Sequence, residues 1–451
     1  MSFEWRIKKI DEIKADIPNA IAMGPFGSNI KTENFVNEGV PIIRGTNLSD
    51  GMLYEEDYVF LTEQKADELK SSNAFPRDLI FTHRGTLGQV GIIPLNSKYK
   101  RYVVSQSQMK LTCDIKKANP FFVYYFFKSP IGQHALLMNT STTGVPAISR
   151  PVTSLKNIEI PLPSLEEQDR IVNLLSALDN KIELNNAINK ILEEIAQALF
   201  KRWFVDFEFP NDNGEPYESS GGEFEESELG LIPKGWKLTQ LEEVIDINPK
   251  SVLKKGECKP YVEMKSIQNN YARVSEYIMR EYSSGSKFSY GDVLFARITP
   301  CLENGKTAYV DFLNDNEVGW GSTEFIVLRS RPGIPSEFAY FLARSDQFRS
   351  HAILSMTGSS GRQRVPESSL RNYRIPLPVT PDLILAFGGV AKSILNLMKR
   401  NDDESNRLIQ IRDTLLPKLM SGKVRVPVDQ ESPQATPWQM VAEESEPYNA
   451  T

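Results

Sequence analysis

The chain repeats itself, in the same order, along most of its length. The stretch SLKNIEIPLP at residues 154–163 returns as SLRNYRIPLP at 369–378, and DLIF at 78–81 returns as DVLF at 292–295. Both pairs have almost the same separation, close to half the length of the chain. Solenoid repeats are much shorter, about 20–50 residues. The period therefore indicates one duplicated domain, and this is the strongest constraint that the sequence places on the fold.

Each copy has the same internal layout. Short apolar or alternating runs such as VPIIRG and DVLFARI come first, between glycines, prolines and asparagines, and such runs are typical of strands. Ile-Pro-Leu-Pro then interrupts the pattern, because proline disfavours helix at the residue before it. A long helix follows, opened by a capping box at 164–167 in the first copy and by Thr380-Pro381 in the second. We expect an α+β fold of two similar mixed α/β domains.

Both long helices carry apolar residues at heptad spacing. The two series match position for position when Ile171 is aligned with Phe387, which places Asn185 and Asn401 at the same a position. The predicted d positions include Leu174, Ile195, Val390 and Ile411. The predicted a positions are Ile171, Leu178, Asn185, Leu192 and Leu199 in the first helix, and Phe387, Ile394, Asn401, Leu408 and Leu415 in the second.

Helix length favours pairing of the two helices. A helix of roughly 35 residues is about 50 Å long, more than one domain of this size is expected to cover. We therefore predict that the helices pack on each other as a coiled coil, the alternative being that each packs on its own domain. A buried a-position Asn can fix register and orientation. We infer an antiparallel orientation, which requires that the chain folds back on itself between the two helices.

Composition describes a globular protein. Hydrophobic residues make up 40% and charged residues 24% of 451 residues, which excludes a disordered chain. No apolar run approaches the roughly 18 residues that a bilayer span needs, and the N-terminal residues lack the apolar core of a signal peptide. Three widely spaced cysteines make neither a disulfide framework nor a zinc pattern. We expect a cytoplasmic protein without membrane contact.

The net charge of -6 is unevenly distributed. Residues 206–230 hold nine acidic residues and residues 429–451 hold five, with no Lys or Arg in either stretch. Without these fourteen acidic residues, the rest of the chain has a net charge of +8. A body of that charge is compatible with DNA binding. Both acidic stretches are interpreted as solvated linker and tail.

Motifs of catalysis are missing from the sequence. No GxxxxGK[ST] or GxGxxG phosphate loop occurs, and the three histidines form no HExxH. Asn119-Pro120-Phe121-Phe122 resembles the base-gripping element of adenine methyltransferases, but a helix start with proline at its first position is favoured. Asp246 with Glu263-x-Lys265 resembles a nuclease set that the first copy does not repeat. We predict no catalysis, metal or cofactor in this chain.

Polar and basic residues gather in the loops of both copies. Arg pairs with guanine, Asn or Gln with adenine, and Lys and Thr suit phosphates, although any one of these residues could be an ordinary solvated loop residue. SSGRQR at 359–364 is the strongest cluster. The candidate DNA contacts are Ser28, Lys31, Arg44, Asn47, Thr82, Arg84, Thr86, Lys98, Lys100, Arg101, Gln106, Gln108 and Thr143 in the first copy, and Lys265, Gln268, Arg297, Thr299, Lys306, Ser359, Arg362, Gln363 and Arg364 in the second.

Nearly the whole chain resembles the specificity subunit of type I restriction–modification enzymes. The most specific stretches are GPFGSNIKTENFVNEGVPIIRGTNL at 24–48, FTHRGTLGQVGI at 81–92, TGVPAISRPVTSLKNIEIPLPSLEEQDRIVNLLSALDNKIELNN at 143–186 and RDTLLPKLMSGKVRV at 412–426. The second copy departs from the pattern, because VTPDLILAFGG stands where the first has SLEEQDRIVNLL. Transfer of residue roles to that copy is correspondingly weaker.

The resemblance implies a recognition subunit without catalysis. Each of two target recognition domains would read one half of a bipartite DNA sequence, and the helices would set the spacer and dock methyltransferase subunits, two of them expected. Those partners would carry S-adenosylmethionine, and a motor–nuclease subunit would use ATP and Mg. The assembled complex would methylate adenine at N6 and cleave DNA.

The repeat and the resemblance together give the expected domain organisation. Alternatives left open are a methylation-only or phage-defence system, and a reader fused to its own nuclease or methyltransferase. Trp203, Phe204 and Phe207 are either partner anchors or core residues. The expected segments are a first recognition domain at 1–160, a central helix at 161–207, an acidic linker at 208–232, a second recognition domain at 233–375, a distal helix at 376–426 and an acidic tail at 427–451.

Overall fold

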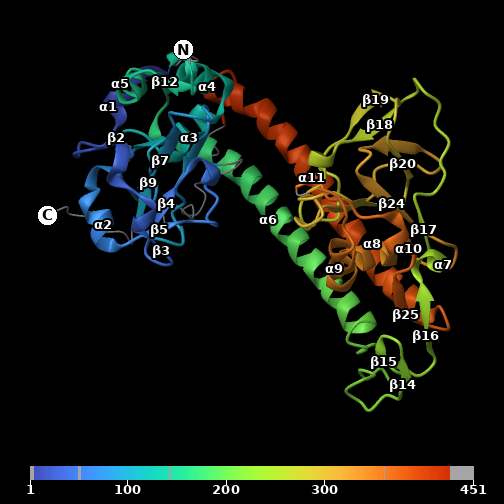
Figure 1. Cartoon of the computed structure of the whole chain (residues 1–451). Coiled ribbons are helices and arrows are strands. Elements are labelled where there is room, and N and C mark those ends of the chain that lie inside the picture. Colours follow the sequence, from blue (N-terminus) through green and yellow to red (C-terminus); the bar gives the residue numbers. More distant parts are fainter. Residues whose placement is uncertain (1–4, 49–51, 142–143, 360, 427–451) are drawn as a thin grey trace. The chain divides into compact units, whose positions relative to one another are not determined.

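The computed structural model describes residues 5–48, 52–141, 144–359 and 361–426. It divides into two compact units, Met1–Ile182 with Asn406–Thr451, and Glu183–Ser405; they are called unit 1 and unit 2. Each unit holds one copy of the repeat (Figure 1). Each long helix is shared between the units. Thr143 and the acidic tail at 427–451 lie outside the described residues.

Unit 1 is built on two sheets. The four-stranded sheet has the order β2(Ile21–Met23)–β10(Gln108–Leu111)–β7(Leu79–Thr82)–β8(Val90–Ile92), and the five-stranded sheet has the order β3(Phe35–Val36)–β5(Phe60–Leu61)–β4(Val40–Ile43)–β9(Tyr102–Val104)–β6(Asn73–Ala74). The apolar helix α3(Pro120–Lys128) packs on the first sheet, with the rings of Phe81 and Phe127 4.9 Å apart.

The other elements of unit 1 flank these sheets. A two-stranded sheet pairs the N-terminal strand with the strand made by Ile-Pro-Leu-Pro. The remaining elements are β1(Arg6–Lys9), α1(Ile10–Ile13), η1(Gly27–Asn29), η2(Thr32–Asn34), η3(Gly45–Asn47), α2(Glu63–Glu68), η4(Lys70–Ser72), α4(Pro130–Leu137), β11(Thr140–Ser141), β12(Ala147–Ile148), α5(Pro151–Lys156) and β13(Glu159–Leu162).

Unit 2 repeats this architecture, as the sequence predicted. Its first sheet has the order β17(Ile245–Ile247)–β24(Phe325–Ser330)–β21(Val293–Ala296)–β22(Thr307–Tyr309), which matches the first sheet of unit 1 strand for strand. The second sheet is β19(Ile278–Glu281)–β18(Cys258–Val262)–β23(Val318–Gly321)–β20(Ser286–Ser289). The remaining elements are β14(Phe224–Ser227), β15(Gly230–Pro233), β16(Trp236–Gln240), α7(Leu241–Val244), η5(Met264–Ser266), α8(Ser336–Arg344), α9(Asp346–Leu354), α10(Glu367–Arg371) and β25(Arg374–Pro378).

The long helices α6(Leu165–Phe204) and α11(Asp382–Met420) run antiparallel. In unit 1 Arg412 donates to Asp179 at 2.9 Å, and in unit 2 Asn185 donates to the carbonyl of Asn401 at 3.3 Å. Asn401 in turn donates to Asn189 at 2.8 Å. The pairing and the interfacial position of both a-position asparagines are thus confirmed.

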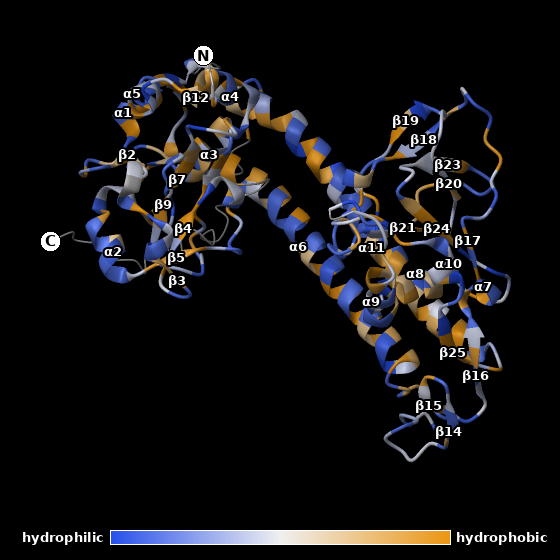
Figure 2. Cartoon of the chain, in the orientation of Figure 1, coloured by the Kyte–Doolittle hydropathy of each residue, from blue (hydrophilic) through white to orange (hydrophobic). Residues whose placement is uncertain are grey.

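The predicted d positions of the heptad pattern lie one residue before the positions that are buried. Leu174, Ile195, Val390 and Ile411 are exposed, and blue and orange alternate along both helices in Figure 2. Each helix contributes to the apolar core of both units and also packs on the other helix, so the buried stripe is wider than a two-position seam. Both packing arrangements considered from the sequence therefore occur together. The buried line is Leu175, Ile182, Asn189 and Ala196 in α6 and Ala391, Met398 and Ser405 in α11.

The segment 208–232, expected to be a solvated linker, is folded. Strands β14 and β15 form a hairpin, and Phe209 stacks on Trp236 with ring centroids 5.2 Å apart. Tyr217 stacks on the same phenylalanine at 4.6 Å. Aromatic residues between the acids supply the apolar contacts that a solvated linker lacks.

Phe204, a proposed partner anchor, is buried in the core of unit 2 against Phe338.

Candidate nucleic-acid interface

Three loop segments meet at one edge of the first sheet of unit 1. They are the end of β7, the turn before β10, and the segment that leads into β12. The amide of His83 donates to the carbonyl of Ser107, that of Gly85 to Pro146, and that of Ile148 to His83, each at 2.9 Å. Backbone hydrogen bonds therefore hold the three segments in place, which lets the side chains between them face outward.

A chain of polar side chains forms the floor of this edge. Gln108 donates to the hydroxyl of Thr82 at 3.2 Å, and that hydroxyl donates to Gln89 at 2.9 Å. The Gln89 amide donates to the carbonyl of Gly45 at 3.1 Å, which ties η3 to the sheet. Thr82 and Gln108 are buried. Because buried polar groups require partners, this network fixes the shape of the edge.

A cavity of about 470 Å³ opens above this floor. Arg84 and Thr86 on its wall are exposed, and Arg44 is half-buried with one guanidinium nitrogen 2.9 Å from the carbonyl of Asp57. The cavity joins donors from two arginines with hydroxyl and amide groups, a set suited to phosphate oxygens and base edges. Five predicted contacts meet here: Arg44, Thr82, Arg84, Thr86 and Gln108.

Asn47 does not fit the prediction of a direct DNA contact. Its side chain is fully buried, its amide donates to the carbonyls of Tyr54 and Glu56 at 3.1 Å, and its oxygen accepts the amide of Arg44 at 3.0 Å. Both N–H groups of this amide are used and its side chain is buried, so it cannot reach a base. The structure gives it the role of holding the loop after η3.

The other candidates of the first copy lie outside this cavity. Gln106 is exposed in the turn before β10, and Ser28 belongs to η1. Lys31 is exposed and lies 3.5 Å from Glu33. Lys98 and Lys100 are exposed, whereas Arg101 is ion-paired with Asp67 at 2.5 Å and with Glu63. The basic strip at 97–102 is thus separate from the cavity.

Unit 2 brings the corresponding three segments together with the same backbone bonds. The amide of Arg297 donates to Glu324 at 3.0 Å, that of Thr299 to Gln363 at 3.1 Å, and that of Val365 to Arg297 at 2.9 Å. Each bond has its counterpart in unit 1. The equivalence fixes which side chains replace one another, so the two edges can be compared position by position.

The side chains on the second edge are different. Alanine and phenylalanine, at 296 and 325, form the pair that corresponds to Thr82 and Gln108. Arg364 takes the place of Ala147 and forms a bidentate ion pair with Glu324, its nitrogens 2.6 to 3.1 Å from the carboxylate oxygens. This pairing holds the pKa of Glu324 below its ordinary value. The second edge therefore presents charged side chains at the positions of Ser107 and Ala147, whereas Ile298 stands at the position of Arg84.

Ser359 and residues 361–364 of this cluster lie in the loop that Thr357 and Arg364 close. Thr357 and Arg364 exchange backbone hydrogen bonds of 3.0 and 2.9 Å, and Arg362 is exposed beyond them. Ser359 is exposed beside it, and the amide of Gln363 donates to the hydroxyl of Thr299 at 3.1 Å. The loop thus presents the exposed side chain of Arg362.

Lys306 has a structural role instead of the predicted DNA contact. Its ammonium donates to the carbonyls of Met264 and Ile267, which holds η5 to the sheet. In unit 1 Gln89 holds η3 to the sheet in the same way, through its bond to the carbonyl of Gly45. This role was not predicted from the sequence, although the position of Gln89 opposite Thr82 could have indicated it. Lys265 is exposed and ion-paired with Glu263 at 2.8 Å, and Gln268 is exposed. Arg297 donates to the carbonyl of Val365 at 2.7 Å.

These features place the chain in the class of proteins with two copies of one α+β domain and an antiparallel helix pair. The chain belongs to the type I restriction–modification DNA specificity family, whose domain model matches residues 8–194 and 233–412. It is 25% identical to the type I restriction enzyme MjaIX specificity subunit of Methanocaldococcus jannaschii, over 94% of either chain. It is 33% identical to the EcoEI specificity subunit of Escherichia coli, over 36% of this chain and 28% of that protein.

A solved structure shares the fold. It is the S subunit of a type I restriction–modification system from M. genitalium, with a TM-score of 0.55 and 16% identity, covering 93% of this chain and 97% of the other. Among the residues described, no helix has the length and apolar character to cross a membrane. The same residues contain no group of three or more His, Cys, Asp or Glu side chains placed to hold a metal ion.

Proposed function

We propose that this chain is the DNA-reading subunit of a type I restriction–modification complex, in which each unit reads one half of a bipartite target. The observation that carries the proposal is the repeated edge: the same three segments, held by the same backbone bonds, present polar side chains in both units. Arg44, Arg84, Thr86 and Gln106 would face the first half-site. Arg297, Arg362, Gln363 and Arg364 would face the second.

The two edges are expected to read different sequences. Side chains specify bases through their donors and acceptors, and those of the two edges differ at equivalent positions. Neutral Ser107 and Ala147 in unit 1 correspond to Glu324 and Arg364 in unit 2. A duplicated fold with unlike side chains would thus recognise an asymmetric, split target.

Catalysis is assigned to partner subunits. The duplication supplies two equivalent surfaces, which suits two methyltransferase subunits that carry S-adenosylmethionine. A motor–nuclease subunit would bring ATP and Mg. This chain would contribute DNA recognition and hold no cofactor, and it would act in the cytoplasm on double-stranded DNA.

The first test is the adenine-methylation map of the source cell, by long-read sequencing, with and without this gene. We expect deletion to remove methylation at one split motif, two short defined halves around an undefined spacer. An unchanged map, with the methyltransferase subunit expressed, would contradict the proposal. Restriction of unmethylated plasmid by the wild-type cell would separate a cleaving complex from a methylation-only one.

The helix pair is expected to act as a ruler. Because the helices are antiparallel partners, one heptad must be added to both, after Ile182 in α6 and after Ser405 in α11. The added rise is about 10 Å, which is about three base pairs. We expect unchanged half-sites and a longer spacer, with weaker methylation because the added base pairs also rotate the second half-site around the DNA.

The matched control for the ruler replaces one heptad at the same places without a change in length. The methylation map should then keep the original spacer. A changed half-site with an unchanged spacer in the lengthened variant would contradict the role of the helices.

A further inference from the structure

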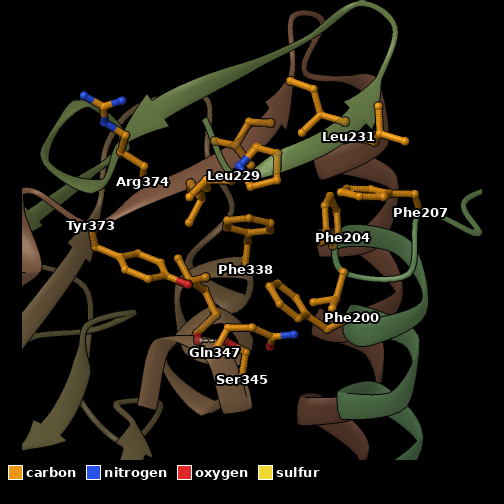
Figure 3. A pocket seen from close by; sticks show the side chains of 16 residues that line it. Phe200, Phe204, Phe207, Leu229, Leu231, Phe338, Ser345, Gln347, Tyr373 and Arg374 are labelled. Carbon is orange, nitrogen blue, oxygen red and sulfur yellow. Dashed lines mark hydrogen bonds between the residues drawn. The ribbon is translucent and has the colours of Figure 1, made fainter. Parts of the chain in front are cut away.

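Unit 2 contains a pocket that plays no part in the proposed DNA edge. Its volume is about 240 Å³, and it lies between the end of α6, the hairpin β14–β15, helix α8 and strand β25. Figure 3 shows Phe200, Phe204 and Phe338 on its inner wall and Leu229 and Leu231 at the hairpin. Aromatic and aliphatic side chains dominate this lining.

The hairpin leaves two leucines at the mouth exposed. Leu229 and Leu231 are 57% and 62% exposed, whereas the adjacent Ile232 is 5% exposed and belongs to the core. A single exposed leucine is ordinary. Two leucines that border an aromatic pocket form a continuous apolar surface, and such surfaces mark binding sites.

The hairpin that borders the pocket is acidic, although the charged residue in the pocket lining itself is Arg374. The hairpin overlaps the stretch 206–230, which has nine acidic residues and no Lys or Arg. Glu226 stands directly opposite Leu231 in the hairpin register, so both side chains project to the same face. Glu226 has no ion pair among the described residues, whereas Arg374 at the rim is ion-paired with Glu228.

The fold itself does not require this apolar mouth. When α6 is aligned with α11, the residue of unit 1 that corresponds to Phe209 is Arg425, whose guanidinium lies 5.9 Å from the ring of Trp5 and pairs with Glu167. Phe209 stacks on Trp236, the residue that corresponds to Trp5. At the equivalent position unit 1 therefore has a charged arginine instead of a phenylalanine. The apolar pocket mouth beside an acidic hairpin is a feature of unit 2.

We propose that the pocket receives a large apolar side chain of the methyltransferase subunit, flanked by Lys or Arg residues that contact the acidic hairpin. The identity of the partner rests on the proposed function, and because unit 1 lacks this mouth, the contact serves one of the two methyltransferase subunits. The acidic hairpin disfavours nucleic acid and anionic lipid, since both would bring negative charge to Glu226. A basic polypeptide gains attraction from the same hairpin, and apolar anchors in pockets carry much of the affinity of interfaces.

The test measures the affinity of the full-length chain for the methyltransferase subunit expressed with it. We expect Leu231→Asp to weaken binding about tenfold or more, the effect of losing an interface anchor, and Glu226→Lys to weaken it about three- to tenfold, because a peripheral charge contributes less. Leu354→Asp, at a leucine 86% exposed on α9, and Glu281→Lys, at an exposed glutamate on β19, are the matched controls and should bind as wild type. Unchanged melting temperatures would confirm that all four variants fold.

The outcomes separate this proposal from the proposed function. If the wild-type complex methylates a split motif and both pocket variants bind normally, the pocket proposal is wrong and the proposed function stands. If only Leu231→Asp weakens binding, the basic character of the occupant is wrong. If the wild-type chain neither binds the methyltransferase subunit nor directs methylation, the proposed function fails as well.

Discussion

Replacement of Arg273 by methionine should lower the free energy of unfolding of unit 2 by about 3–5 kcal/mol near pH 8, the cost of breaking a buried ion pair from one side. The Arg273 guanidinium is almost fully buried and donates to Asp311 and to Asp402 on α11, each at 2.8 Å. Without it, two carboxylates would face each other in a poorly solvated site. Urea denaturation of the full chain measures the change.

The loss of unfolding free energy in Arg273→Met should be smaller at lower pH. Burial already raises the pKa of Asp311 above its ordinary value, although Arg273 opposes this; in the variant the pKa rises further. A carboxyl group whose pKa is higher in the folded than in the unfolded chain destabilises the fold at high pH, and this effect fades as the pH falls toward the unfolded value near 3.9. The difference from wild type should therefore shrink between pH 8 and pH 5.

A matched control is available on the surface of the same unit. Arg331 pairs with Asp246 at 2.8 Å, but the two side chains are 46% and 43% exposed. Arg331→Met should cost less than about 1 kcal/mol. Equal losses for the two arginine variants, or a loss at Arg273 that grows as the pH falls, would contradict the assignment of a buried ion pair.

Much of the architecture followed from the sequence because it depends on repetition and periodicity. The strand runs around 78–81 and 292–295 occupy the same place in matching sheets, and Asn185 and Asn401 meet at the helix interface. The second seam position was wrong because a heptad describes a helix with one partner. Here each helix contacts a domain as well, and that contact is not visible in local spacing.

The candidate edge was predicted only in part. Arg84 and Gln108, both predicted DNA contacts by residue type, line one cavity, but the sequence could not show that Gln108 lies in its floor and Arg84 on its wall. Asn47 and Lys306 were assigned to DNA by their chemistry, whereas both satisfy buried carbonyl groups. Which polar residue serves the fold depends on contacts between distant segments. The folded acidic hairpin was missed for the same reason.

Alanine substitution of one arginine on each edge should separate the two half-sites. Arg84→Ala is expected to weaken binding by about 1–3 kcal/mol and relax sequence preference in the first half-site only, and Arg362→Ala should do so in the second only. Both side chains are exposed, and each lies beside its own set of three converging segments. Stability should be unchanged, because neither arginine holds the fold.

The measurement is selection of duplexes randomised in one half-site at a time, at one fixed salt concentration. Arg400→Ala is the control: Arg400 is exposed on α11, away from the edge of unit 2, so its loss removes one charge without removing a reader. If Arg84 and Arg362 contact only phosphate, their variants would weaken binding to every sequence equally. The salt dependence of binding would fall by about one released counterion. Relaxation of both halves by either variant would mean that the two edges do not read DNA independently, because a half-site reader confined to one unit cannot alter preference in the other.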